Sequence, residues 1–169
     1  MAAEQGDADA QVSLGQLYRG WLWGDYPGGF PKDYKEAEKW YRLAVDQGHP
    51  VAQAELGAML VGSKDMRRNF PESSRLLRLA SKQNFAPAQR SLGAMYMMGY
   101  GVDRDNVTAQ MWFIIAASNT VSDDSATGSG SKQEAMSVFL AKSMSPEEIS
   151  KGQAMATACV QSNYTDCGE

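Results

Sequence analysis

The sequence AQVSLG at residues 10–15 returns as AQAELG at residues 52–57 and as AQRSLG at residues 88–93. A second apolar stretch follows each copy and closes on a small residue, which is Ala44, Ala80 or Ala116. Ala80 follows Ala44 by 36 residues, and Ala116 follows Ala80 by the same interval. A fixed period of this length is typical of helix pairs stacked into a solenoid. The pattern therefore predicts an all-α solenoid with a binding function, without identifying the partner.

Each unit is predicted to contain two closely packed helices. Pro50 and Pro87 suit the first turn of a helix, where a backbone N–H is not needed. The second helices alternate small with bulky residues: Ala37, Trp40, Tyr41 and Ala44, then Ser73, Leu76, Leu77 and Ala80, then Ala109, Trp112, Phe113 and Ala116. Three glycines, Gly15, Gly57 and Gly93, lie inside the first helices at a cost of about 1 kcal/mol each relative to alanine. We expect them to allow a close approach of the partner helix.

The charge balance restricts the class of partner. Sixteen basic and twenty acidic residues give a net charge of −4. Nucleic acids and anionic membranes are bound through basic patches, so this balance argues against both. No apolar run approaches the roughly 18–20 residues of a spanning helix. We therefore expect a protein or peptide ligand and no membrane insertion, and the sequence gives no indication of the oligomeric state.

The two cysteines, Cys159 and Cys167, both lie near the end of the chain. A pair with this spacing and no nearby histidine is a poor zinc site. The two residues form either a disulfide that pins the tail to the last helix, which implies an oxidising compartment, or two free thiols in a cytosolic protein. Because the chain has no other cysteine, we favour the disulfide. On this pair alone we expect a periplasmic or cell-envelope location, with the cytoplasm as the alternative.

The domain boundaries follow from the repeats. Residues 2–6 match residues 44–48, the end of a repeat, so we expect the chain to open within the last turn of a preceding helix. A capping box at 145–148 opens a predicted final helix that runs to about Cys159. The predicted units are 1–5 as the tail of a truncated preceding repeat, 6–47, 48–83 and 84–119 as repeats 1 to 3, 120–133 as a flexible loop, and 134–169 as C-terminal capping helices and tail.

These residues resemble the Sel-1-like repeat family, a tetratricopeptide-like helical repeat family. The third copy carries nearly the whole family pattern: Ala88, Leu92, Gly93, Tyr96, Gly99, Tyr100, Gly101, Val102, Asp105, Ala109, Trp112, Ala116 and Ala117. The resemblance implies a right-handed superhelix that serves as a protein-interaction scaffold. It also implies that some bacterial relatives act in the envelope, in secretion systems or as immunity proteins. Cysteine-rich relatives staple each repeat with a disulfide, and this chain lacks those pairs.

By analogy with tetratricopeptide repeats, the first helices line a concave binding groove. The predicted groove positions are Asp9, Val12, Gln16 and Arg19, then Val51, Ala54, Ala58 and Val61, then Arg90, Ala94, Met97 and Met98. They describe a mostly apolar floor with two arginines near its ends. Met97 and Met98 can equally be half-buried residues at the entry to a loop.

A second candidate surface is an aromatic loop in the first copy, which is six residues longer than the same loop in the third copy. Its aromatic residues are Trp21, Trp23, Tyr26 and Phe30. They either pack as a small core on the neighbouring helices or expose at least one tryptophan as an anchor for a partner.

The sequence offers no constellation for catalysis, a metal or a cofactor. His49, the one histidine, lies in an inter-repeat turn without the partners of a triad or a metal site. The favoured interpretation is a non-catalytic interaction module, either an envelope adaptor or an inhibitor or immunity protein. The alternative is a cell-wall or β-lactam hydrolase of the kind proposed for cysteine-rich relatives.

Overall fold

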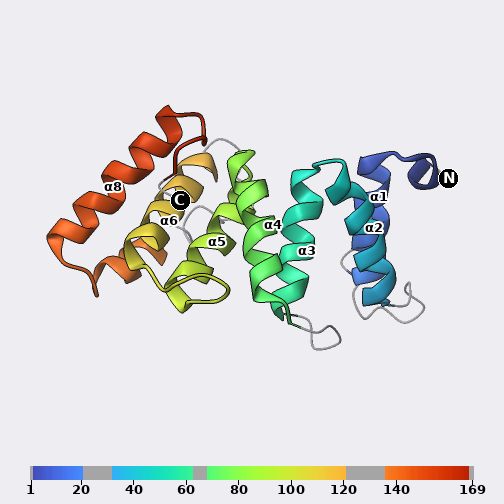
Figure 1. The fold of residues 1–169 in the computed structure, drawn as a ribbon, viewed down its shortest axis with the longest axis horizontal. Coiled ribbons are helices and arrows are strands. Elements are labelled where there is room, and N and C mark those ends of the chain that lie inside the picture. The colour runs from blue at the N-terminus through green and yellow to red at the C-terminus, as the bar shows by residue number, and fades with distance from the viewer. Residues whose placement is uncertain (1, 21–31, 63–67, 121–135, 168–169) are drawn as a thin grey trace.

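The structure is a computed structural model that describes residues 2–20, 32–62, 68–120 and 136–167. The helices are η1 (Ala2–Gln5), α1 (Ala8–Arg19), α2 (Tyr34–Asp46), α3 (Pro50–Gly62), α4 (Phe70–Lys82), α5 (Ala86–Met98), α6 (Asn106–Thr120) and α8 (Pro146–Gln161). Residues 136–141 form a further short helix. Each of α1 to α5 packs on the next helix in the chain, and α8 packs on α6. The described residues thus form the predicted all-α solenoid, with η1 and α1 at one end of the stack and α8 at the other (Figure 1).

The glycines of the repeated motif lie where two helices meet most closely. A Cβ atom added at Gly15 would lie 2.5 Å from Cε1 of Tyr41 on α2. A Cβ atom added at Gly93 would lie 2.9 Å from Cε1 of Phe113 on α6. Real Cβ contacts are longer than this, so any side chain would force the opposing ring, or the helix that carries it, to shift. The prediction that these glycines allow close helix packing is confirmed.

The second helices build the core as the alternation of small and bulky residues predicted. All twelve predicted positions are buried except Trp40, which is half-buried. In the first helices Leu56 and Leu92 are fully buried, whereas the equivalent Leu14 is half-buried. Leu14 lies on α1, which packs on α2 and η1 at the end of the stack. A helix at the end has fewer neighbours than one in the middle.

A buried glutamine recurs in each first helix and ties successive units together. Gln11, Gln53 and Gln89 are at most 4% exposed. Each accepts a hydrogen bond at its side-chain oxygen from an amide at the end of the second helix of its own unit: from Gln47 (2.8 Å), Gln83 (2.9 Å) and Asn119 (2.8 Å). The side-chain nitrogens of Gln11 and Gln89 donate to carbonyls of the preceding segment, Ala3 (3.1 Å) and Ser81 (3.2 Å). Amide pairs thus replace water for these polar groups inside the stack.

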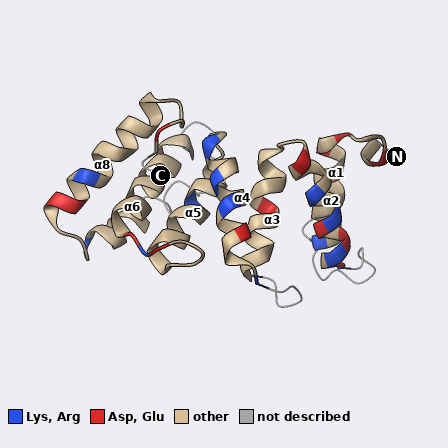
Figure 2. Cartoon of the chain, in the orientation of Figure 1, with Lys and Arg blue, Asp and Glu red and all other residues tan. Residues whose placement is uncertain are grey.

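Charge is distributed unevenly along the solenoid (Figure 2). The helices α1 and α2 carry both signs, and basic residues predominate on α4. Helix α6 carries no charged residue at all, because α5 and α8 cover it on two sides. Among the described helices, none combines the length and apolar character needed to cross a bilayer.

Several helix ends lie where local signals in the sequence predicted them. Helix α3 begins at Pro50, and Pro87 lies in the first turn of α5. Ser145 and Glu148 form the predicted capping box, with each side chain bonded to the backbone of the other residue. Gly99 and Gly101 adopt positive φ angles of 73° and 68° in the turn after α5. Most of the predicted loop at 120–133 lies outside the described residues.

Candidate functional site

An apolar pocket opens between α3 and α5, with α4 beneath it. Its volume is about 290 Å³. The lining residues are Ala58, Val61, Gly62, Leu77, Ser91, Ala94, Met95, Met98 and Tyr100. Four of these, Ala58, Val61, Ala94 and Met98, are groove positions expected from the sequence. The structure therefore brings the C-terminal halves of two predicted groove helices together around one cavity.

The rim of this pocket is made by two exposed apolar side chains. Met98 is 57% exposed and Tyr100 is 44% exposed. Gly99 ends α5 in the left-handed conformation, and the backbone N–H of Tyr100 donates a hydrogen bond to the carbonyl of Met95 (3.0 Å). The Tyr100 ring then stacks on Phe70, with ring centroids 4.8 Å apart. The glycine turn thus holds an aromatic ring at the mouth of the pocket.

The pocket offers little to a charged ligand. Its described lining residues include no charged side chain. Ser91 and Tyr100 supply the hydroxyls, and Ser91 Oγ already donates to the carbonyl of Pro87 (2.9 Å). Leu77 and Met95 on the floor are almost fully buried. Such a lining favours an apolar group, because a charge placed there would lose its hydration without gaining a partner.

The predicted groove positions on α1 and at the start of α3 have other neighbours. Arg19 forms an ion pair with Glu55 of α3. Asp9 contacts Nε2 of His49 at 2.9 Å. Val12 and Ala54 are buried in hydrophobic clusters of the core. The remaining two, Gln16 and Val51, are half-buried. None of these lies among the residues described around the apolar pocket.

The two adjacent methionines face different neighbours. Met97 packs beside Phe113 and Leu140, together with Met136 and Met144 of the C-terminal cap. Met98 lies at the pocket rim. Successive helical residues differ by about 100° in direction, so one step along the chain changes which surface a side chain reaches. Arg90 is half-buried and is not among the described lining residues.

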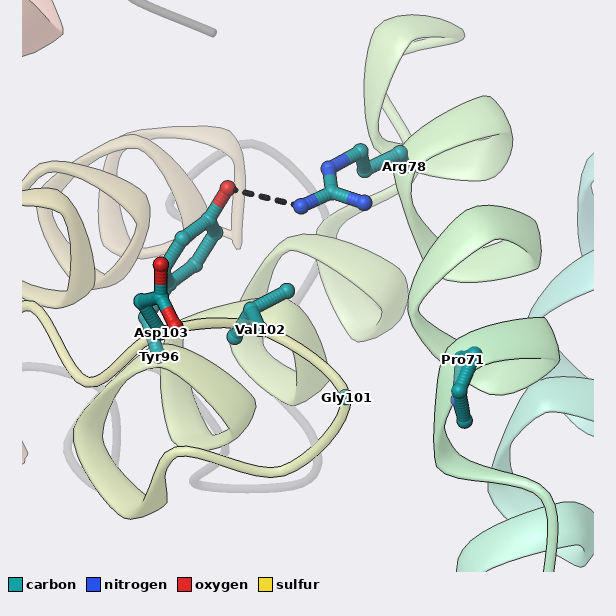
Figure 3. A pocket seen from close by; sticks show the side chains of 6 residues that line it. All are labelled: Pro71, Arg78, Tyr96, Gly101, Val102 and Asp103. Atoms are coloured by element: carbon teal, nitrogen blue, oxygen red, sulfur yellow. Dashed lines mark hydrogen bonds between the residues drawn. The ribbon is translucent and has the colours of Figure 1, made fainter.

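A second, more polar pocket lies between α4 and the turn that follows α5 (Figure 3). It measures about 650 Å³ and is lined by Pro71, Arg78, Tyr96, Gly101, Val102 and Asp103. Arg78 Nη2 donates to Tyr96 Oη (3.0 Å), and the guanidinium lies 5.7 Å from the centre of the Tyr96 ring. Sequence reasoning did not identify Arg78. Its equivalent in the first repeat, 36 residues earlier, is another arginine, Arg42.

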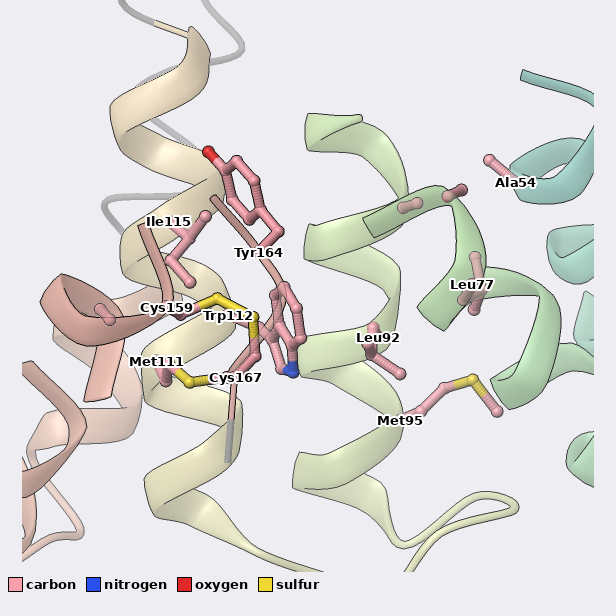
Figure 4. Close-up of a cluster of buried hydrophobic side chains, with 13 residues drawn as sticks. Ala54, Leu77, Leu92, Met95, Met111, Trp112, Ile115, Cys159, Tyr164 and Cys167 are labelled. Carbon is pink, nitrogen blue, oxygen red and sulfur yellow. A yellow bond between two sulfur atoms is a disulfide. The ribbon is translucent and has the colours of Figure 1, made fainter. Parts of the chain in front are cut away.

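The C-terminal cap is held by a disulfide between Cys159 and Cys167, as predicted. Both residues are buried in one cluster with Met111 and Trp112 of α6 (Figure 4). The tail also returns Tyr164 to the stack, where its hydroxyl lies 3.5 Å from Asn119 Oδ1. The disulfide thus fastens the tail to α8, the last helix.

Within the part of the chain that the structure describes, no group of three histidine, cysteine or carboxylate side chains could hold a metal ion. His49 contacts Asp9 on the surface of the stack, as stated above. The aromatic loop with Trp21, Trp23, Tyr26 and Phe30 lies outside the described residues. Its role as a small core or as an anchor stays a prediction.

The comparisons with known proteins agree with the fold. The Sel1 repeat family model matches residues 8–49, 50–85 and 86–121. The solved structure of a Sel1 repeat protein from Oxalobacter formigenes is 32% identical, with a TM-score of 0.62, and the match covers 72% of this chain and 46% of that one. A protective antigen present in uropathogenic Escherichia coli strains, which displays an SLR fold, is 21% identical, with a TM-score of 0.61, over 98% of this chain and 40% of that one.

The chain therefore spans less than half the length of these two solved proteins. A comparison with curated proteins found no match. The second likeness, at its low identity, shows the fold alone. The three family matches cover more than half of the sequence, and the chain belongs to the Sel1 repeat family.

Proposed function

We propose that this chain is a non-catalytic module that binds a segment of a partner protein in the apolar pocket between α3 and α5. Sel1 repeats are helical scaffolds typical of protein–protein interaction. The observation that carries the proposal is the exposed pair Met98 and Tyr100 at the mouth of an apolar cavity. Tyrosine and methionine are both enriched at the centre of protein interfaces.

The dimensions of the pocket set the size of the bound segment. Along α5 the lining runs from Ser91 to Met98, which is about 10 Å at 1.5 Å per residue. An extended peptide rises about 3.3 Å per residue, so about three residues fit over this length. One bulky apolar side chain is the natural anchor, and its full burial contributes about 1.5–3 kcal/mol. Methionine at the rim adapts its shape to the anchor.

The disulfide in the C-terminal cap bears on the compartment in which the protein acts. A disulfide persists in oxidising compartments, so the bonded Cys159 and Cys167 support a periplasmic or cell-envelope setting. In that setting we propose an assembly adaptor or an inhibitor or immunity protein, both of which act by binding. Two reactive thiols, by titration of the unreduced protein in denaturant, would contradict this location, because both cysteines are buried in the folded chain.

The test places a photo-crosslinking amino acid at position 98 in the native host. Position 43 is the matched control, because Leu43 is also exposed but lies on α2, away from the pocket. The proposal expects a discrete crosslinked protein from position 98 that disappears when Ala58→Trp fills the pocket. The same products from both positions, or none from position 98, would contradict it. Turnover of a β-lactam or of cell-wall fragments by the purified protein would instead favour the hydrolase alternative.

A further inference from the structure

The charges of this chain are segregated along the sequence. Residues 64–90 contain seven basic and two acidic side chains, a net charge of +5. Residues 1–63 carry a net charge of −4 and residues 91–169 a net charge of −5. The overall charge of −4 therefore hides a basic centre between two acidic ends.

The outer face of α4 concentrates this positive charge. Arg75, Arg78, Leu79 and Lys82 fall within about 100° of arc on the helix. The opposite side, with Leu76, Leu77 and Ala80, is buried in the core. Arg75 and Lys82 are exposed, and Leu79 is 40% exposed between them. We call the four residues Arg75, Arg78, Leu79 and Lys82 the α4 stripe. In Figure 2 the basic residues of α4 are drawn in blue.

The one carboxylate in α4, Glu72, makes its hydrogen bonds to side chains outside the stripe, and the charge of Arg75 within the stripe also acts on it. Glu72 accepts a hydrogen bond from Arg42 of α2 (2.7 Å) and another from Asn69 (2.9 Å). Arg42 also pairs with Glu38 on its own helix (2.7 Å). Glu72 thus mainly serves the contact between α2 and α4. The stripe keeps an excess of positive charge.

Apolar surface accompanies this charge. Besides Leu79, the stripe borders the polar pocket through Arg78, whose guanidinium lies over the Tyr96 ring (Figure 3). Val102 and Pro71 line the same pocket, and Asp103 is the acidic side chain among its described lining residues. The surface therefore presents cations with an apolar side chain between them and a cavity beside them.

We propose that the α4 stripe is a second interaction surface, which binds an acidic amphipathic segment of a partner protein. Carboxylates on that segment pair with Arg75, Arg78 and Lys82, and an apolar side chain of the segment packs on Leu79. The positive charge of the stripe complements such a segment, and charge complementarity steers and orients association. The acidic ends of this chain repel a long polyanion, and the stripe is short, which favours a protein segment over a nucleic acid. The stripe lies on the opposite side of α4 from Leu77 and the apolar pocket, so this proposal is separate from the pocket.

The test uses a labelled 18-residue helical peptide with glutamate and leucine on one face, and fluorescence anisotropy in about 50 mM salt. The variant R75E/K82E reverses two exposed charges of the stripe. The matched control K142E/K151E changes the net charge by the same amount at exposed lysines of the cap. We expect the Kd for the peptide to rise about tenfold or more in R75E/K82E, because attraction becomes repulsion at two positions, and to rise about twofold or less in the control. Raised salt should weaken wild-type binding.

Three results would overturn the proposal. They are an equal loss of peptide binding in both variants, no binding of the peptide by the wild type, and tighter binding of a single-stranded oligonucleotide or of phosphatidylserine vesicles through the same residues. The variant R75Q/K82Q replaces R75E/K82E if thermal unfolding shows that the reversal disturbs the fold. Met98→Ala, which alters the apolar pocket, should leave peptide binding unchanged, so failure of one proposal is distinguishable from failure of the other.

Discussion

Replacing Gly15 with alanine tests whether the repeated glycines exist for close helix packing. The new Cβ atom would lie 2.5, 2.6 and 2.9 Å from three carbons of the Tyr41 ring. Optimal carbon contacts lie at about 3.5–4.0 Å, so the ring would have to move by about 1 Å. Tyr41 is fully buried, and overpacking of a core costs about 1–3 kcal/mol. Three short contacts with one ring place this site near the upper end, at about 3 kcal/mol.

Alanine also favours the helical conformation over glycine by about 1 kcal/mol. The expected net effect is a loss of about 2 kcal/mol in the free energy of unfolding, or roughly 4–8 °C in Tm for a chain of this size. Circular dichroism during thermal and urea unfolding measures both quantities. Gly62→Ala is the control, because nothing lies within 4 Å of a Cβ atom at the end of α3.

The control should be neutral or gain up to about 1 kcal/mol. If Gly15→Ala is as stable as Gly62→Ala, close packing is not the reason for the glycine. A second check combines Gly15→Ala with Tyr41→Leu, because Leu77 faces Gly57 in the second unit, where an added Cβ atom would lie 3.0 Å from its nearest neighbour instead of 2.5 Å. Coupling between the two substitutions should recover part of the loss, because the smaller side chain leaves room for the methyl group.

Three further predictions concern the core and the cap. Replacing both Cys159 and Cys167 with serine should lower the free energy of unfolding by about 2.5 kcal/mol, because the unfolded chain regains the entropy of the loop that the disulfide closes. In urea unfolding, a reducing agent should have no further effect on this double variant. Gln89→Leu should destabilise by about 1–3 kcal/mol, since it removes the hydrogen bonds that the buried Gln89 amide makes with Ser81 and Asn119. Gln153→Leu on the exposed face of α8 should change urea stability little. Burial raises the pKa of Tyr41 to about 12, so this tyrosine ionises first in the unfolded state, and the free energy of unfolding should fall as pH rises from 10 towards 12. Tyr41→Phe should reduce that fall. At pH 7 the same substitution should be neutral or stabilising, because the Tyr41 hydroxyl has no hydrogen-bond partner among the described residues.

The fold was predictable from the sequence because its signals are local and repeated. The 36-residue period and a glycine that faces a large side chain return in each of the three units, and prolines lie in the first turns of α3 and α5. The binding surface was less predictable. Val12 and Ala54 come from an alignment with another repeat class, yet both are buried here. Whether such a position faces the groove or the core depends on how far one unit is rotated against the next, which periodicity does not encode.

The polar features were missed for a related reason. Gln47 and Gln83 are exposed residues at helix ends, and nothing in their local sequence indicates that they reach a buried glutamine. The signal lay in Gln11, Gln53 and Gln89, which occupy the same place in all three copies of the motif. A polar residue repeated at a core position indicates a repeated partner. The α4 stripe was likewise hidden, because a net charge averages a basic centre with acidic ends.

The buried glutamines have a mechanical consequence for the apolar pocket. Apolar contacts between helices carry no directional preference, so a stack held by them alone can slide and bend. Gln53 and Gln83 join α3 to the end of α4, and Gln89 joins α5 to Ser81 at the end of that same helix. These bonds act as pins at one end of the three helices that form the pocket. They restrict sliding of α3 and α5 against α4, so we expect the proposed ligand to meet pocket walls that are already ordered and to lose little binding energy in ordering them.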